Sequence, residues 1–163
     1  MLIGGQAVLL HGRPRLTEDI DITLTADPSR LNDVLEACAT LKLQALPEDV
    51  ELFVQQSFVL PVLHDETDIR VDFIFSSTPY EREAIDRAVM VELRGESVPF
   101  ATAEDLIVHK LLAGRAIDLE DAAAVVRRKG SELDWRYVEK WVGQFSDVPG
   151  HEDLPDLLAD IRK

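Results

Sequence analysis

The feature that most constrains the fold is a pair of aspartates inside an apolar strand pattern near the start of the chain. The run RLTEDIDI at residues 15–22 alternates acidic and branched apolar side chains from residue 19 onward. Successive side chains of a strand point to opposite faces, so Asp19 and Asp21 share one face and Ile20 and Ile22 share the other. The pattern therefore predicts a strand with an apolar layer on one side and an acidic site on the other.

Two glycines precede this strand. Gly4 and Gly5 begin a segment that reads as a short helix over residues 5–10, which Gly12-Arg13-Pro14 ends because proline disfavours helix before it. Backbone amides at a glycine turn that opens a helix suit an anion, and paired carboxylates suit a divalent cation. The combination favours a site for metal and phosphate, although Gly-Gly alone is also typical of a tight turn and Asp-x-Asp alone is common on exposed strands.

A third acid stands in a later strand pattern. Residues 70–75 read RVDFIF, which places Asp72 among residues that prefer burial. A carboxylate in such a strand is costly unless it is paired or bound to metal. We therefore expect Asp72 to join Asp19 and Asp21 on one sheet face, with a simple pair to Arg70 as the alternative.

Composition excludes several function classes. The 163-residue chain carries a net charge of −14, which works against generic DNA binding because affinity for phosphate backbones rests on Lys and Arg. Two short basic groups, Arg13 with Arg15 and residues 127–129, are candidate contacts for an RNA end or a solvated surface. No apolar run approaches the roughly 18–20 residues of a membrane span, and the start does not resemble a secretory signal, so we expect a cytoplasmic protein without membrane contact.

The remaining chemistry-bearing residues carry no motif. The single cysteine, Cys38, has no internal disulfide partner, and the four histidines lack the spacing of a zinc site. No P-loop sequence occurs.

The pattern of elements predicts an α+β fold, with a mixed sheet of about five strands flanked by helices and a helical C-terminal portion. We expect residues 1–101 to form a catalytic core and residues 102–163 to form a helical portion that completes the active site. The expected strands cover 19–25, 58–60, 69–75, 89–93 and 97–100. The expected helices cover 5–10, 28–41, 47–56, 80–88, a segment opened by a capping box at Thr102, 118–129, 134–145 and 152–162.

The order Gly-Gly, Asp-x-Asp and later strand Asp resembles the nucleotidyltransferase superfamily that includes DNA polymerase β and the aminoglycoside nucleotidyltransferases. Within it, residues 15–21 and the run AEDLIVHKLLAGR at residues 103–115, with Asp118 and Asp121, are similar to the abortive-infection (AbiEii) type of toxin nucleotidyltransferases. The resemblance covers about residues 3–126.

This resemblance implies roles for individual residues. Asp19 and Asp21 would hold Mg²⁺, with two ions as the expected number, and Asp72 would complete the metal site or act as base for the incoming hydroxyl. Lys110 would be catalytic through contact with the phosphates; its alternative is a solvated cation on an amphipathic helix. The nucleotide-binding group implied by the resemblance is Gly4, Gly5, Arg15, Thr17 and Lys110.

The implied activity is transfer of a nucleoside monophosphate from a nucleoside triphosphate to an acceptor hydroxyl on a tRNA end, a protein or a small molecule. The same resemblance implies a toxin with an antitoxin protein as partner. Two alternatives remain open from the sequence. One is a non-catalytic protein-binding module with the same fold, and the other is an antibiotic-modifying nucleotidyltransferase.

The chain departs from its relatives in two places. They carry a helix and a full strand before the glycine turn, whereas this sequence offers only Met1-Leu2-Ile3. We therefore expect either a clipped start or a very short first strand. A missing helix would expose apolar sheet surface, which a second copy of the chain (a homo-oligomer) or a partner protein would cover. Gly5 stands where other branches have Ser.

For Arg115 and Asp121 we favour a salt-bridged joint between two helices, and Asp118 fits either the joint or the site.

Overall fold

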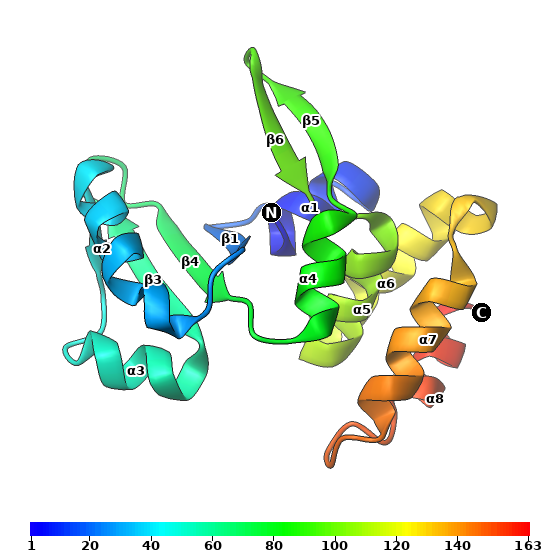
Figure 1. Ribbon diagram of the computed structural model, residues 1–163. Helices are drawn as coiled ribbons and strands as arrows, with labels where there is room; N and C mark the ends of the chain where they lie inside the picture. The colour runs from blue at the N-terminus through cyan, green and yellow to red at the C-terminus, as the bar shows by residue number, and fades with distance from the viewer.

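The computed structural model describes residues 1–163 and has the expected α+β architecture (Figure 1). The strands are β1 (Asp19–Leu24), β2 (Leu43–Ala45), β3 (Val59–His64), β4 (Arg70–Phe75), β5 (Val89–Leu93) and β6 (Glu96–Phe100). The α-helices are α1 (Gly4–His11), α2 (Leu31–Thr40), α3 (Val50–Ser57), α4 (Pro79–Asp86), α5 (Ala103–Ala113), α6 (Ala116–Lys129), α7 (Trp135–Ser146) and α8 (Leu154–Ile161). Short 3₁₀ turns cover Pro28–Arg30 and Gly130–Glu132.

The strands form a four-stranded sheet and a separate hairpin. The sheet has the order β1-β4-β3-β2, with β1 and β4 parallel and the other neighbours antiparallel. The hairpin of β5 and β6 projects from the body (Figure 1). Leu2 connects the two, because it bridges to Ile22 in β1 and to Phe100 in β6. The hairpin and the sheet are thus separate units joined through Leu2, where the sequence led us to expect one sheet.

Strand β2 was not expected. It is only three residues long and lies at the sheet edge, where it pairs with β3. It follows Lys42, whose φ of 57° is unusual for a residue other than glycine and turns the chain out of α2. A segment this short has no detectable alternation, so its strand state depends on the neighbouring β3.

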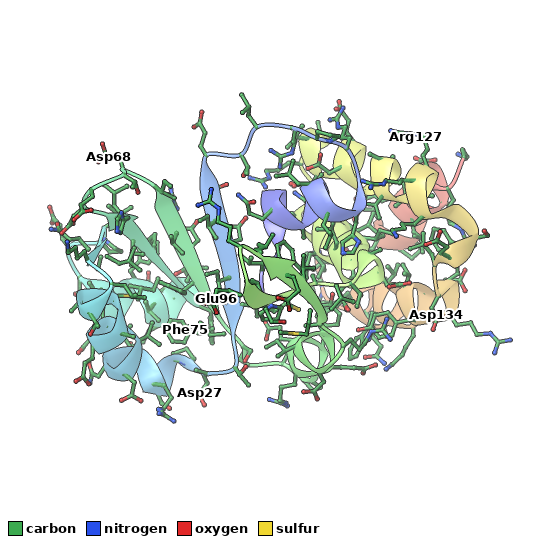
Figure 2. All side chains as sticks on the ribbon, turned by 90° about the horizontal axis from the view of Figure 1, so that it is seen from above. Asp27, Asp68, Phe75, Glu96, Arg127 and Asp134 are labelled. Carbon is green, nitrogen blue, oxygen red and sulfur yellow. The ribbon has the colours of Figure 1, made fainter.

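Two apolar cores divide the molecule. The larger core joins α1, α4 and the base of the hairpin to the C-terminal helices, and the smaller core lies between the four-stranded sheet and helices α2 and α3. In Figure 2, Phe75 lies in the lobe of the smaller core, whereas Arg127 and Asp134 lie at the other end of the molecule. Strand β1 and the segment before it therefore lie where the two lobes meet.

Helices α5 and α6 are positioned by clear local signals. The Thr102 side chain accepts a hydrogen bond from the Asp105 amide and caps α5, but the full capping box expected from the sequence does not form, because the Asp105 carboxylate accepts the Thr102 hydroxyl instead of the Thr102 backbone N–H. Gly114 ends α5 in the left-handed conformation, with φ of 64°. This turn brings the start of α6 back against the end of α5, where Lys110 lies. None of the helices is long and apolar enough to cross a lipid bilayer.

Candidate active site

The candidate active site begins as a square of four side chains on two parallel strands. In the β1–β4 register Asp19 pairs with Arg70, and Asp21 pairs with Asp72. Ile20 and the other alternate residues of both strands face α2 and α3 in the smaller core. The parallel register and the two-residue spacing therefore place all four polar side chains on the sheet face turned away from those helices.

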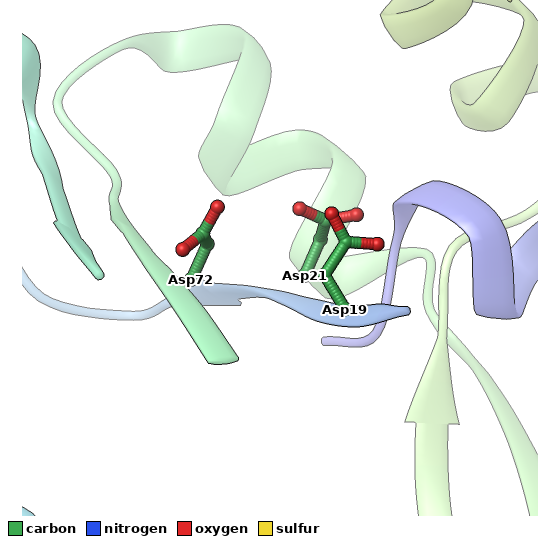
Figure 3. Close-up of side chains that lie close together, drawn as sticks. All are labelled: Asp19, Asp21 and Asp72. Atoms are coloured by element: carbon green, nitrogen blue, oxygen red, sulfur yellow. The ribbon is translucent and has the colours of Figure 1, made fainter. Parts of the chain in front are cut away.

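The three carboxylates of this square converge. One oxygen from each of Asp19, Asp21 and Asp72 can be chosen so that all three lie within 4.8 Å of one another. Figure 3 shows the three side chains rising from the same side of β1 and β4. The expected convergence of these residues is present in the structure, and their catalytic role stays a prediction.

Asp21 is the carboxylate without a partner. No hydrogen bond or ion pair reaches its side chain, whereas burial, followed by the charges of Asp19 and Asp72, raises the pKa of the Asp21 carboxyl. The positive charges of Lys110 and Arg115 act in the opposite direction and lower the pKa of the same carboxyl. A cation bound between the carboxylates would relieve both the repulsion and the missing contact.

The two glycines pack directly against this site. Gly4 has φ of 56°, and a Cβ atom added there would lie 1.7 Å from Oδ2 of Asp21. A Cβ on Gly5 would lie 2.3 Å from Oγ1 of Thr17. Both positions need glycine because the backbone of the turn lies directly against the side chains of Asp21 and Thr17. This close approach also explains why Gly5 leaves no space for the Ser of other branches unless Thr17 moves.

The carboxylates of Asp19 and Asp72, unlike that of Asp21, each accept hydrogen bonds from one side chain. Thr17 donates its hydroxyl proton to Oδ1 of Asp19 over 3.0 Å. Arg70 donates from Nε to Oδ1 of Asp72 over 2.8 Å and from Nη2 to Oδ2 over 3.0 Å. Asp72 thus pairs with Arg70 and also lies beside the other two acids on the same sheet face. The two arrangements expected as alternatives are both present.

Lys110 is buried rather than solvated. Its side chain is 6% exposed, and Nζ lies 2.7 Å from Oδ1 of Asp118 and 3.2 Å from Oδ2 of Asp121. Both aspartates are fully buried. The alternative of a solvated cation on an amphipathic helix is therefore wrong, because α5 packs into the larger core on most of its surface.

Further cations surround the same two aspartates. Arg115 donates from Nε to Oδ2 of Asp118 over 2.5 Å, and Arg15 donates from Nε to Oδ2 of Asp121 over 3.1 Å. Burial by itself would raise the pKa of Asp118, but hydrogen bonds from Arg115 and Lys110 outweigh it and hold the pKa below its ordinary value. Arg115, Asp118 and Asp121 thus all take part in the joint between α5 and α6, and Arg15 ties the loop after α1 to it.

Two site features were missed by sequence reasoning. Arg70 was considered only as a competing partner of Asp72, whereas the structure makes it the fourth corner of the square. Asp118 was expected either in the joint or in the site, and the structure places it in the joint. Two spacings carry this assignment: Asp118 lies three residues after Arg115 and eight residues after Lys110, and it pairs with both. The i, i+3 pairing is indicated by the sequence, but the pairing across the Gly114 turn needs the fold.

Comparison with known proteins identifies the family. The profile of the family described as "Nucleotidyl transferase AbiEii toxin, Type IV TA system" matches residues 1–133. The chain therefore belongs to the AbiEii family and is a nucleotidyltransferase. The resemblance drawn from the glycine turn, the three aspartates and the Lys110 helix is confirmed. No curated protein matches the sequence significantly.

Solved structures support the fold. An antigenic nucleotidyltransferase-like protein from Paracoccidioides brasiliensis aligns with a TM-score of 0.55 at 13% identity, covering 99% of this chain and 83% of that one. The antibiotic-resistance factor ANT(2'')-Ia, whose solution structure is described as revealing substrate-regulated conformation dynamics, aligns with a TM-score of 0.57 at 16% identity, covering 93% and 85%. At these identities the likeness shows a shared nucleotidyltransferase fold.

Proposed function

We propose that this protein transfers a nucleoside monophosphate from a nucleoside triphosphate to an acceptor hydroxyl in a metal-dependent reaction. The observation that carries the proposal is the convergence of Asp19, Asp21 and Asp72 within 4.8 Å at the meeting point of the two lobes. Membership of the AbiEii family supports the general activity. It also supports the further proposal that the protein acts as a toxin and has an antitoxin protein as its partner.

The residues fit a divalent cation such as Mg²⁺. They offer only carboxylate oxygens, which are the ligands that Mg²⁺ prefers, and Asp21 has no partner within the chain. Asp19, Asp21 and Asp72 would hold the metal, for which we propose two ions. Bound metal would neutralise charge on the phosphates as the nucleotide reacts.

The chain's own residues would position the nucleotide. The turn at Gly4 and Gly5 lies against Asp21 and Thr17, so a phosphate held by its amides would lie beside the carboxylates. Lys110 and Arg15, the two cations proposed for the phosphates, are held by the buried aspartates of the α5–α6 joint. Residues 102–163 would in this way complete the site built by residues 1–101.

A transfer assay tests the proposal. The protein is incubated with each α-³²P-labelled nucleoside triphosphate and Mg²⁺, together with total RNA or a cell lysate. Label in RNA, in protein or in a small molecule supports transfer and identifies the acceptor class, the last outcome indicating an antibiotic-modifying type. The D21N variant is expected to lose activity by about 100-fold or more, the scale of loss when a preorganised electrostatic contact to the reacting groups is removed.

Two outcomes would overturn the proposal. One is the absence of label from every fraction, which would favour the non-catalytic binding module. The other is transfer that continues unchanged in EDTA or in D21N.

A further inference from the structure

Arg70 is the one cation in the square of polar side chains, and it donates hydrogen bonds to only one of the two carboxylates next to it. It faces Asp19 across the strands and Asp72 along its own strand. Both of its hydrogen bonds go to Asp72, one to each oxygen, over 2.8 and 3.0 Å. Asp19 receives the hydroxyl of Thr17 instead. The pairing is therefore specific to one carboxylate.

A guanidinium fork of this kind fixes the plane of a carboxylate. Each carboxylate oxygen has about two lone pairs, so a bidentate arginine occupies one on each oxygen and leaves one on each free. The Asp72 side chain is 16% exposed, whereas the Arg70 side chain is 51% exposed. Arg70 is thus the more exposed member of the pair, and its fork leaves each Asp72 oxygen with a lone pair for a further ligand.

Without this fork Asp72 has a reason to turn away. Asp21 is its direct neighbour across the strands, and like charges in such a pair repel. No other hydrogen bond or ion pair reaches the Asp72 carboxylate. Arg70 is therefore the group that offsets the repulsion and holds the third carboxylate next to the other two.

We propose that Arg70 is a positioning residue, whose bidentate fork holds the Asp72 carboxylate in the orientation needed to share a divalent cation with Asp19 and Asp21. The inference rests on the proposed metal-dependent transfer, and it assigns to Arg70 a role that acts through Asp72. Charge alone does not fill this role, because the ammonium of a lysine is a compact point charge with rotatable donors and no planar fork.

The R70K variant tests the inference because it keeps the charge and removes the fork. Two measurements are made: binding of Mn²⁺ to the protein without nucleotide, followed by electron paramagnetic resonance of the free ion, and the steady-state kinetics of transfer. Loss of an outer partner of a metal ligand costs about 10- to 100-fold in metal affinity or activity. We expect R70K to weaken Mn²⁺ binding and lower kcat on this scale, with KM for the nucleotide little changed.

The matched control is R30K. Arg30 is 66% exposed and also donates to an aspartate on its own chain segment, Asp33, but lies in the 3₁₀ turn before α2. R30K should bind Mn²⁺ and turn over as the wild type does.

Three results separate the possibilities. If R70K equals the wild type in both measurements, the fork is not needed and the inference is wrong. If R70K raises KM for the nucleotide without changing Mn²⁺ binding, Arg70 contacts the phosphates and the inference is wrong. If the wild-type protein itself transfers no label, the proposed function fails, and Mn²⁺ binding still tests the placement of Asp72.

Discussion

Two groups of aspartates in this molecule face opposite electrostatic situations. In the square on β1 and β4, three carboxylates share one arginine fork and one hydroxyl, and burial with like charges raises the pKa of Asp21. In the α5–α6 joint, two fully buried carboxylates are surrounded by Lys110, Arg15 and Arg115, and the pKa of Asp118 is lowered. One group is short of positive charge and the other is well supplied.

The difference fits the proposed metal site on the sheet and a structural support at the joint. Buried charges that are matched within the chain contribute to holding elements in place, and removing one partner is costly. Carboxylates left unmatched on a rigid sheet are a cost to the fold, which a bound cation offsets. We infer that the joint positions its cations beside the square, while the square remains open to metal.

The largest effect on stability is expected at Lys110. K110M fills a similar volume but leaves Asp118 and Asp121 without their shared cation in a buried setting. Breaking a buried pair by removing one partner typically costs about 3–5 kcal/mol, and we expect a loss of that size in the free energy of unfolding measured by urea denaturation. A loss below about 1 kcal/mol, the usual value of an exposed pair, would show that the joint is not a structural support.

Replacing aspartate by asparagine should change the free energy of unfolding differently in the two groups. D118N weakens charged hydrogen bonds from Lys110 and Arg115, and we expect a loss of about 2 kcal/mol in the free energy of unfolding. D21N removes repulsion across the strands, so in EDTA it should leave stability unchanged or raise it by up to about 1 kcal/mol. Urea denaturation of both variants under metal-free conditions is the measurement. Destabilisation of equal size in the two variants would remove the distinction between the groups.

The glycine turn gives a smaller effect with a close control. G4A and G114A both place a Cβ on a residue with positive φ, 56° and 64°, which costs about 1–2 kcal/mol in each case. Only the Cβ at position 4 would collide with Asp21, because position 114 meets nothing closer than 3.7 Å. G4A should therefore lose transfer activity and metal binding, while G114A retains both. Similar activity in the two variants would show that the contact with Asp21 is not needed.

The smallest effect concerns a buried base without a counter-ion. Burial lowers the pKa of His11, whose Nε2 lies 2.7 Å from the carbonyl oxygen of Ala101. The unfolded chain binds a proton near pH 6.5 and the folded chain only at lower pH, so the free energy of unfolding should fall as the pH drops below about 6.5. H11Q should reduce this dependence between pH 7.5 and 5.5 in EDTA, and the part that remains is expected from His109, whose pKa is also lowered by burial. An unchanged slope in H11Q would assign the pH dependence to other groups.

Much of the site was predictable because its signals are local. The alternation in β1 and β4 fixes the face of each aspartate, and the glycine turn and the Thr102 cap are short-range patterns. The convergence of Asp72 with Asp21 followed from the expectation that the two strands are neighbours. The family resemblance pointed to the same residues, and the profile match over residues 1–133 confirms that resemblance.

The rest depends on contacts between distant segments. Burial of Lys110 cannot be read from α5 alone, because its counter-ions lie on α6 beyond the turn at Gly114. The position of Arg15 beside Asp121 joins residues 106 positions apart. The separation of the hairpin from the sheet depends on the placement of Leu2 between them. In each case the sequence names the residue but not its partner.

A titration of metal-free protein with Mn²⁺ that compares the wild type with D21N and with D118N tests whether the square on β1 and β4 binds metal. We expect the wild type and D118N to bind the ion, and D21N to bind it at least about 10-fold more weakly, because one ligand of the site loses its negative charge. Equal binding by the wild type and D21N, or loss of binding in D118N alone, would contradict the proposed metal site.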